Sequence, residues 1–583
     1  MADPALPLEA ALRRAVAEAF PAAADADPVV RPSSDPRFGD YQANGAMALG
    51  KRLGRPPREV AQALAECFDA AGAGVDQPEV AGPGFLNLRL TPAWLSDRLN
   101  ELVADPRLGI ATAEHPERVV VDYSAPNVAK EMHVGHLRST IIGDALVRIL
   151  AFLGHDVVRQ NHVGDWGTPF GMLIEHLLDL GEEEAADELS VGDLTAFYQE
   201  ARKKFDSDVD AASGFAGRAR QRVVLLQAGD AETLRLWHLL VDESKRYFNL
   251  VYQRLGVLLS DDDLAGESFY NDRLGPTCDE LVERGIAVPS EGALCVFPPG
   301  FPGRDGGPMP LMVKKSDGGF GYDATDLAAV RYRTRDLGAT SVVYVVGAPQ
   351  AQHLALVFAG AVLAGWLGGV TGRRAVHVAF GSVLGADGKM LKTRSGASAK
   401  LIDLLDEAVE RAAAIVAERS ELSAEEQAAV AEAVGIGGVK YADLSNDRTR
   451  DYTFDYDRML ATDGNTGAYL QYAVARCRSI LRKGGAPAEA GVVVVEPAER
   501  ALALALLRLD AAVRAAADDL APHKLSGHLF DLAQAFTSFY DLCPVLKAPD
   551  EPTRASRLAL CRLTADALAL GLGLLGIAAP GRM

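Results

Sequence analysis

The sequence predicts an α/β protein with three parts: a small N-terminal α+β domain, a central domain on a parallel sheet, and a C-terminal all-α helical bundle. Three observations support this prediction. Strand-like and helical segments alternate from about residue 118 to 400, a mixed helix and strand pattern precedes them, and Ala- and Leu-rich amphipathic helices follow. A chain of 583 residues also exceeds what one hydrophobic core supports, so several domains are expected.

The first 112 residues form the N-terminal domain in this prediction. Apolar periodicity predicts one helix over about 5–20 and a second over about 57–71. The first segment carries Glu9 and Glu18 among its apolar positions and lacks the basic start of a signal peptide, so we expect a domain helix. The stretch FLNLRL at 85–90 is strand-like.

The central domain, residues 113–400, starts with a strand, a helix and a second strand. VVVDY (119–123) is rich in β-branched residues, the helix covers 137–152, and DVVRQ (156–160) is the next strand. This order is typical of a βαβ unit in a parallel sheet, with a right-handed crossover. A mostly helical stretch follows from about 168 to 260, and we expect a helical insertion at about 185–265.

The second half of the central domain repeats the alternation. SVVYVVG (341–347) predicts a strand, 351–367 a helix and 375–380 another strand. A Gly- and Pro-rich segment at 298–308 predicts a mobile surface hairpin. Residues 401–583 predict the helical bundle, with breaks near 420, 446–465 and 484–491.

Composition narrows the class of protein. The chain is 49% hydrophobic and 24% charged, which is ordinary for a soluble globular protein, and no long uncharged apolar run predicts a transmembrane helix. The six cysteines are dispersed without a C-x-x-C pair, which argues against a zinc knuckle or a disulfide framework and favours a cytoplasmic protein. The net charge of −20 is an average over the whole surface, so it does not decide whether a nucleic acid binds.

The most informative motif is His133-Val-Gly-His136, which follows the strand VVVDY and opens the predicted helix. It puts two imidazoles one turn apart at a helix N-terminus, where unpaired N–H groups and the helix dipole favour an anion. Gly135 has no side chain, so a flat ring can approach the backbone. The pattern indicates nucleotide binding with the triphosphate at the helix start; two histidines that only cap a helix are the alternative.

A basic loop follows the last strand of the second half. Lys389, Lys392 and Arg394 lie among the glycines at 385, 388 and 396. Lysines supply point charges that can follow a phosphate as negative charge builds up on it. A solvated turn is the alternative, but ligands of open α/β sheets bind at the carboxyl ends of the strands, where this loop is expected.

These segments resemble a known family. The strings SAPNVAKEMHVGH and LRSTIIGD, together with NHVGDWG at 161–167, are similar to arginyl-tRNA synthetases, which are class I aminoacyl-tRNA synthetases. HVGH corresponds to the HIGH signature of that class, and KMLKT at 389–393 corresponds to KMSKS, with Leu391 and Thr393 replacing its serines. GDYQ, GPGFLNLRL, GNTGAYLQYA and the ending LGIAAPGRM also match, so the resemblance covers nearly the whole chain.

The resemblance implies a split Rossmann-like catalytic domain between a tRNA-elbow (D-loop) domain and an anticodon-binding bundle. It also implies ATP-dependent activation of L-arginine and its transfer to arginine tRNA, with activation that depends on bound tRNA. The implied transition-state ligands are His133, His136, Lys389 and Lys392. The implied ATP-binding residues are Pro126, Lys130, His133, Gly135, His136, Gly164, His353 and Met390.

The resemblance implies substrate contacts as well. The arginine-binding residues are expected to be Ser124, Asn127, His133, Glu267, Tyr322, Asp326 and Gln350. A guanidinium calls for carboxylates that offer two-point bonds, which suits Glu267 and Asp326, although Asp326 could instead cap a helix. The expected tRNA-binding residues are Tyr41, Phe85, Asn87, Tyr469, Tyr472 and Arg476; the tyrosines and Phe85 could instead be core residues.

The remaining expectations concern cofactors, partners and rival functions. We expect ATP as a substrate with Mg²⁺ held mainly by its phosphates, no dedicated metal site and no tightly bound prosthetic group. A cytoplasmic monomer without membrane contact is expected. Two rivals remain open: a synthetase of the same class for another amino acid, and a catalytically silent relative that binds RNA or acts as a scaffold.

Overall fold

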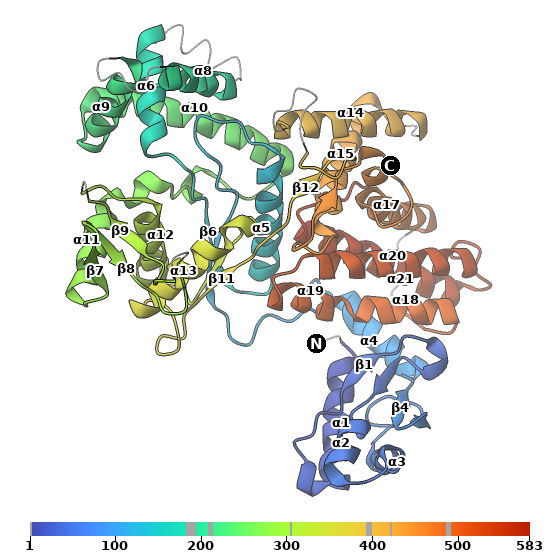
Figure 1. Ribbon diagram of the computed structural model, residues 1–583. Helices are drawn as coiled ribbons and strands as arrows, with labels where there is room; N and C mark the ends of the chain where they lie inside the picture. Colours follow the sequence, from blue (N-terminus) through green and yellow to red (C-terminus); the bar gives the residue numbers. More distant parts are fainter. Residues whose placement is uncertain are drawn as a thin grey trace. The chain divides into compact units, whose positions relative to one another are not determined.

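The computed structural model describes residues 3–181, 194–207, 214–303, 306–316, 318–391, 399–419, 422–485 and 491–583 (Figure 1). The chain forms two compact units. One contains residues 1–111, 462–573 and 578–583, and the other contains residues 112–461 and 574–577. The first unit therefore combines the N-terminal region with the last helices, and the second contains the parallel sheet.

The N-terminal part of the first unit is an α+β domain, as predicted. Its four-stranded antiparallel sheet has the order β1-β2-β4-β3, with β1 Val30–Pro32, β2 Tyr41–Ala43, β3 Glu79–Ala81 and β4 Phe85–Leu88. Its helices are α1 Ala5–Ala19, α2 Ala46–Leu53, α3 Pro57–Cys67 and α4 Pro92–Ala104. Val16, Phe20 and Leu64 are among the buried residues of its core. The helix predicted over 57–71 ends at Cys67 because Phe68 is extended.

The rest of the first unit is helical. It consists of α17 Gly467–Gly484, α18 Pro497–Leu507, α19 Leu509–Asp518, α20 His523–Leu542 and α21 Glu551–Leu574. Buried bonds join it to the N-terminal sheet: Arg500 pairs with the Asp40 carboxylate, and Arg508 Nε donates to the Tyr41 hydroxyl at 3.2 Å. These contacts explain why the two parts form one compact unit.

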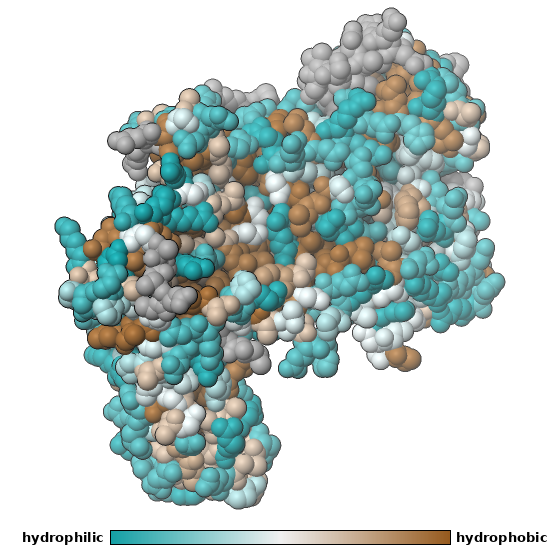
Figure 2. Space-filling model, turned by 180° about the vertical axis from the view of Figure 1, so that it is seen from behind, coloured by the Kyte–Doolittle hydropathy of each residue, from teal (hydrophilic) through white to brown (hydrophobic). Residues whose placement is uncertain are grey.

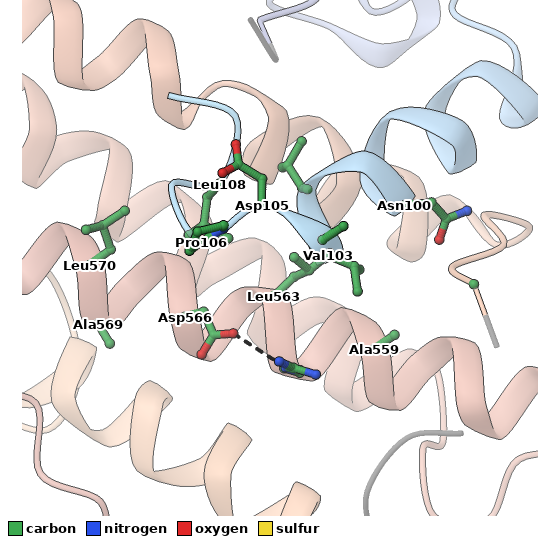
Figure 3. A pocket seen from close by; sticks show the side chains of 14 residues that line it. Asn100, Val103, Asp105, Pro106, Leu108, Ala559, Leu563, Asp566, Ala569 and Leu570 are labelled. Atoms are coloured by element: carbon green, nitrogen blue, oxygen red, sulfur yellow. Dashed lines mark ion pairs between the residues drawn. The ribbon is translucent and has the colours of Figure 1, made fainter. Parts of the chain in front are cut away.

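An open cavity of about 850 Å³ lies in the first unit between the end of α4 with its following loop and α21 (Figure 3). Its lining is largely apolar and includes Val103, Leu108 and Leu563. The ion pair in Figure 3 joins Arg562 to Asp566 at 3.7 Å, and both of these side chains are more than half exposed. The cavity is thus a solvent-exposed gap between packed elements.

The second unit contains the predicted parallel sheet, with the order β11-β10-β5-β6. The strands are β5 Arg118–Asp122, β6 Asp156–Gln160, β10 Ser341–Tyr344 and β11 Arg374–His377. Helix α5 (Val134–Phe152) connects β5 to β6, and α13 (Ala351–Leu363) connects β10 to β11. Because β5 of the first half pairs with β10 of the second, the carboxyl ends of both halves meet at one edge, where ligands of such sheets bind.

Between these halves lie helices and a small antiparallel sheet, which the last of these helices follows in the chain; the insertion expected at about 185–265 stays a prediction. The helices are α6 Thr168–Leu180, α8 Leu194–Ser207, α9 Phe215–Gln227, α10 Ala231–Leu255, α11 Asn271–Glu283 and α12 Tyr322–Arg331. The strands β7 Ala287–Ser290, β8 Ala293–Val296 and β9 Leu311–Lys314 form the sheet. Pro302 pairs with Pro308, as in the predicted hairpin; its mobility stays a prediction.

The second unit also contains α14 (Leu401–Arg419), α15 (Ala424–Leu444), α16 (Tyr456–Met459) and the short parallel pair β12 (Val383–Leu384) with β13 (Tyr452–Thr453). A buried ion pair of 3.0 Å, Arg138 Nε to Asp443 Oδ2, joins α5 to α15. The helices after residue 400 thus divide between the two units, while the functional boundary predicted there stays a prediction.

Short helical turns complete the elements: η1 Pro21–Ala23, η2 Pro36–Phe38, η3 Asp261–Asp263, η4 Glu267–Tyr270, η6 Ala348–Gln350 and the π-helical η5 Tyr332–Asp336. The face in Figure 2 mixes hydrophilic and hydrophobic residues. Across the described ranges, no helix combines the length and apolar character that crossing a membrane requires.

Candidate active site

The two histidines of HVGH cap helix α5. His133 is the N-cap residue, and its Nδ1 accepts the N–H of Gly135 at 3.0 Å. His136 Nδ1 accepts the N–H of His133 at 3.1 Å, and the ring centroids lie 4.0 Å apart. A Cβ at Gly135 would come within 2.7 Å of the His133 ring, so this position needs glycine. The helix was predicted from Leu137; it begins at Val134, directly after its capping histidine.

Burial determines the charge of both imidazoles, and the capping bonds determine which ring nitrogen carries the proton. Burial lowers the pKa of His133, with a smaller contribution from Lys130. Burial, then His133 and Lys130, lowers the pKa of His136 to about 3. Both rings are therefore neutral near pH 7. Because each Nδ1 accepts a backbone N–H, the proton of each ring lies on Nε2, which leaves two donors for an anionic ligand.

The loop between β5 and α5 is held in a strained conformation. Three of its residues have φ in the left-handed region: Ser124 (75°), Ala125 (47°) and Ala129 (57°). Their N–H groups donate to side chains from other segments: Ser139 Oγ, Asn161 Oδ1 and Ser244 Oγ. Strain of this kind persists only where surrounding bonds enforce it, and it concentrates at functional sites.

Several predicted residues lie in or beside this loop. Gly164 donates its N–H to the Pro126 carbonyl at 3.1 Å, which brings two predicted ATP-binding residues together. A Cβ at Gly164 would lie 2.4 Å from Asn127 Oδ1, so glycine lets the exposed Asn127 stay where it is. Ser124 differs: it is buried, with its Oγ 2.7 Å from the Tyr252 hydroxyl, so its side chain faces the interior.

The segments on both sides of residues 392–398 are held by backbone bonds, and the one that follows them is anchored beside HVGH. On one side, Leu391 N–H donates to Val383 O at 3.1 Å, which closes a hairpin that presents Lys389 and the exposed Met390. On the other side, the N–H of Val134 donates to Ala399 O at 3.2 Å, beside His133. The predicted catalytic Lys392 lies outside the described residues. The ammonium of Lys130 lies 4.0 Å from the centroid of the Tyr198 ring.

An acidic cluster surrounds the first turn of α12. His353 Nε2 lies 2.6 Å from Asp326 Oδ2, and its Nδ1 lies 3.6 Å from Asp323 Oδ1. The His353 ring also packs edge-on against Tyr322, with centroids 5.1 Å apart. Burial opposes a charge on His353, but the hydrogen bond and charge of Asp326 outweigh it and raise the pKa of the imidazole. His353, predicted to bind ATP, thus lies among the predicted arginine-binding residues; Gln350 is exposed just before α13.

Glu267 belongs to the same electrostatic cluster. Burial, then the charges of Asp165 and Asp326, raises the pKa of the Glu267 carboxyl to about 7. Asp165 accepts the N–H of Ser268 at 2.8 Å and its hydroxyl at 2.6 Å, which holds the backbone next to Glu267. Carboxylates that repel one another are stabilised by a cation, and a guanidinium fits because it offers several donors in one plane. The sequence analysis missed Asp165, although NHVGDWG contains it.

The aromatic cluster on α17 lies in the first unit. Tyr472 is 40% exposed, and the Arg476 guanidinium lies 5.0 Å from its ring centroid and 4.8 Å from that of Tyr540 on α20. Tyr469 is half-buried, with its hydroxyl 3.0 Å from Thr537 Oγ1. The structure brings Tyr472 and Arg476 together and adds Tyr540, which no local sequence signal linked to them.

Two predicted tRNA-binding residues of the N-terminal domain are buried. Tyr41 is fully buried, and burial raises the pKa of its phenol to about 12. Asn87 is 4% exposed, and its Oδ1 accepts from Gln42 Nε2 at 2.8 Å. Phe85 is half-buried. The side chains of Tyr41 and Asn87 therefore stabilise the sheet and its neighbours in this structure rather than form its surface.

Family models match three consecutive parts of the chain. The N-terminal domain of arginyl-tRNA synthetases matches residues 7–90, the catalytic domain of class I tRNA synthetases (R) matches residues 98–456, and the DALR anticodon-binding domain matches residues 470–583. The fold and this order of domains define a class I aminoacyl-tRNA synthetase.

Individual relatives are similar in sequence to this chain over its full length. The chain is 57% identical to the arginine–tRNA ligase of Thermobifida fusca, covering 100% of both chains, and 53% identical to that of Frankia casuarinae, covering 99% and 98%. Its fold matches the arginyl-tRNA synthetases of Plasmodium falciparum (TM-score 0.84, 30% identity, 99% of both chains) and Thermus thermophilus (TM-score 0.82, 27% identity, 99% and 100%). The chain belongs to the arginyl-tRNA synthetase family.

Proposed function

We propose that this chain is an arginine–tRNA ligase. In the first step, the carboxylate of L-arginine attacks the α-phosphorus of ATP, and the bond to the leaving pyrophosphate breaks. In the second step, a hydroxyl of the 3′-terminal ribose of arginine tRNA attacks the arginyl carbonyl, and AMP leaves. Membership of the family over the whole chain supports this proposal. The observation that carries it is the neutral His133 and His136 pair, beside which the backbone of Ala399 is anchored.

The phosphate chemistry needs positioning and charge stabilisation rather than a nucleophilic side chain. The Nε2–H groups of His133 and His136 donate to phosphate oxygens, and Lys389 and Lys392 neutralise charge on the leaving pyrophosphate. Nearby groups complete the ATP site: Pro126, Lys130, Gly135, Gly164 and Met390. Mg²⁺ enters with ATP and is held mainly by the phosphates.

The acidic cluster binds the arginine side chain. Glu267 and Asp326 accept bonds from the guanidinium, Tyr322 closes over it, and Gln350 and Asn127 contact the other end of the substrate. Support comes from the raised pKa of Glu267, since burial and two neighbouring carboxylates disfavour its charge until a cation arrives.

The first unit binds tRNA. Tyr472, Arg476 and Tyr540 offer exposed rings and a guanidinium for stacking on unpaired anticodon bases, with Tyr469 beside them. Phe85, Asn87 and Tyr41 belong to the domain that we assign to the tRNA elbow. We further propose a cytoplasmic monomer without membrane contact; all six cysteines are free, as expected in a reducing compartment.

A panel of the twenty amino acids, assayed for adenylate formation with and without bulk tRNA, tests this function. The expected result is formation of an adenylate with arginine alone, and only when tRNA is present. Activity with another amino acid would identify a different synthetase, and no activity with any would identify a silent RNA-binding relative. Robust pyrophosphate exchange with arginine and ATP alone would refute the tRNA requirement.

A further inference from the structure

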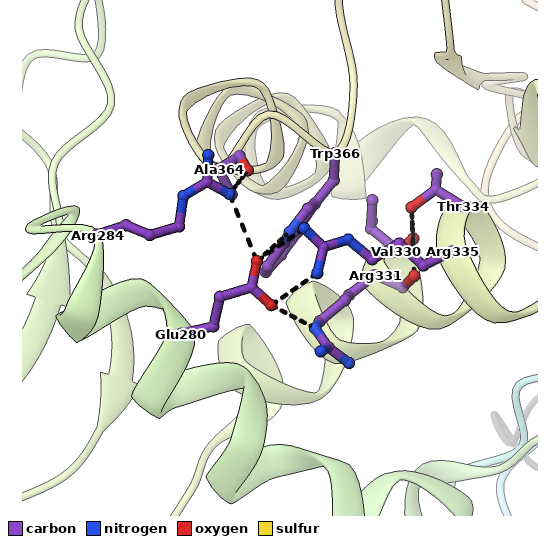
Figure 4. Close-up of polar contacts among 8 residues, drawn as sticks. All are labelled: Glu280, Arg284, Val330, Arg331, Thr334, Arg335, Ala364 and Trp366. Atoms are coloured by element: carbon purple, nitrogen blue, oxygen red, sulfur yellow. Dashed lines mark hydrogen bonds and ion pairs between the residues drawn. The ribbon is translucent and has the colours of Figure 1, made fainter. Parts of the chain in front are cut away.

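Three arginines and a buried tryptophan surround a single carboxylate in the second unit (Figure 4). Glu280 forms a two-point bond with Arg335, at 2.9 Å for both contacts, and accepts from Arg331 Nε at 2.8 Å. It also accepts from Trp366 Nε1 at 3.0 Å and lies 3.4 Å from Arg284 Nη1. The Glu280 side chain is 17% exposed, and both oxygens of its carboxylate accept bonds from donors.

The elements that meet at Glu280 are the ones that carry the proposed arginine-binding residues. Glu280 lies on α11, which continues directly from the turn η4 that begins at Glu267. Arg331 ends α12, which begins with Tyr322 and carries Asp326 in its second turn. Arg284 also donates to the carbonyl of Ala364, the C-cap of α13, whose N-cap is Gln350.

The proposed substrate contacts thus precede the Glu280 cluster along each helix: Glu267 lies before α11, Asp326 lies midway along α12, and Gln350 caps α13. At 1.5 Å per residue, the two ends of each helix are separated by roughly 10–20 Å. Glu280 does not touch the proposed arginine site, so any effect on substrate must act through the helices.

The cluster depends on the charge of Glu280. Burial opposes that charge, but hydrogen bonds from Arg331 and Trp366 and the charges of Arg335 and Arg331 lower the pKa of the carboxyl. Without the carboxylate, three guanidiniums would repel one another, and the N–H of the fully buried Trp366 would lose its acceptor. The helix ends would then separate or shift.

We propose that Glu280 is a positioning residue for arginine binding: it holds the far ends of α11, α12 and α13 together and so fixes the spacing of Glu267, Asp326 and Gln350. This inference rests on the proposed function of those three residues. It requires no contact between Glu280 and the substrate.

Kinetics of Glu280→Gln in the full-length chain test this role. The variant keeps the side-chain shape and removes the charge, so we expect the KM for arginine to rise about tenfold while the KM for ATP and kcat at saturating arginine stay nearly unchanged. Glu280→Asp keeps the charge and should restore most of the arginine KM. A purely structural role would instead reduce the amount of active enzyme, lowering apparent kcat without changing the arginine KM.

Two further variants make the result decisive. Glu117→Gln breaks a more exposed two-point pair with Arg374, at 2.7 and 3.0 Å, which involves no residue of α11, α12 or α13, and should leave the arginine KM unchanged. Glu267→Gln should raise it, because it removes a proposed contact. An unchanged arginine KM in Glu280→Gln overturns the inference. If Glu267→Gln is also unchanged, the proposed arginine site fails as well.

Discussion

At the scale of single residues, His133 and His136 both cap a helix and serve the proposed chemistry. The same Nδ1 atoms that accept backbone N–H groups direct each ring proton to Nε2. The capping alternative and the phosphate-binding interpretation are therefore compatible. The sequence could predict this pair because its members are three residues apart and the helix geometry is local.

Substitution of His133 tests this interpretation. His133→Ala should lower the rate of adenylate formation by roughly 10²–10³, because one donor to the transferring phosphate is lost. The measurement is single-turnover adenylate formation with saturating ATP, arginine and tRNA. His155→Ala is the control, since His155 Nδ1 also accepts a backbone N–H, that of Glu117, at the opposite edge of the sheet. Equal rates in wild type and His133→Ala would contradict the assignment.

The raised pKa of Glu267 predicts a pH dependence. Only the charged carboxylate binds a guanidinium well, so the KM for arginine should increase as pH falls below about 7. The pKa of His353 is also raised, by its bond to Asp326, so its protonation as the pH falls acts in the same direction. Glu267→Gln should remove most of the dependence while leaving the contribution of His353. A flat pH profile in wild type between pH 6 and 8 argues against the role of Glu267.

The same shift predicts a change in stability. The folded chain holds a proton on Glu267 more tightly than the unfolded chain does, so the free energy of unfolding should fall as pH rises from about 4.5 to about 7. Arginine should offset this loss, since it binds the charged form. Thermal unfolding of wild type and Glu267→Gln, each with and without arginine, measures both effects; identical pH profiles for the two proteins would contradict them.

Other residues of the site could not be identified from sequence, because their partners are distant in the chain. Asp165 contacts Ser268 after more than one hundred residues, and Tyr540 reaches Arg476 from another helix. Tyr41 illustrates the opposite case: the sequence suggested an exposed tRNA contact, but Arg508 binds its hydroxyl from beneath the sheet. Tertiary packing determines whether such side chains are buried or exposed, and no local sequence pattern predicts it.

At the scale of elements, the predicted βαβ unit and the C-terminal helices are confirmed, and the differences occur at the ends of helices and strands. The helix predicted over 351–367 ends at Leu363, because Gly365 and Gly368 adopt φ of 65° and 98°. The strand predicted over 156–160 is observed with the same bounds, since a β-branched run between a glycine turn and a polar loop leaves little ambiguity.

The N-terminal sheet and the C-terminal helices of the first unit are held together by Asp40. It pairs with Arg500, accepts the N–H of Leu90 at 2.8 Å and is 6% exposed. Asp40→Asn should lower the free energy of unfolding by about 3 kcal/mol, because it leaves the half-buried Arg500 without a charged partner, and should raise the KM for tRNA more than that for arginine. Chemical denaturation and charging kinetics measure these effects.

Asp35→Asn is the matched control for that variant. The Asp35 carboxylate bonds to the neighbouring Arg37, and this pair is largely exposed. It should change stability by less than about 1 kcal/mol. If Asp40→Asn behaves like Asp35→Asn, the bonds of Asp40 do not hold the two parts together.

At the scale of the whole molecule, two compact units account for a chain that three family models match. The fold class was predictable because each region has a distinct pattern of hydrophobic residues. The way the chain divides was not: the last helices pack with the N-terminal domain, and α14 and α15 belong to the unit that contains the sheet, where they contact α5. That pairing depends on contacts such as Arg138 with Asp443, which are far apart in the sequence.

The central claim is that this chain attaches arginine to tRNA. The most direct test is charging of bulk tRNA by the purified full-length chain with ATP, supplying each of the twenty amino acids separately in labelled form. Our account predicts that labelled arginine alone becomes attached to tRNA and that the attachment depends on ATP. Attachment of a different amino acid, or no attachment of arginine by a folded preparation, would contradict it.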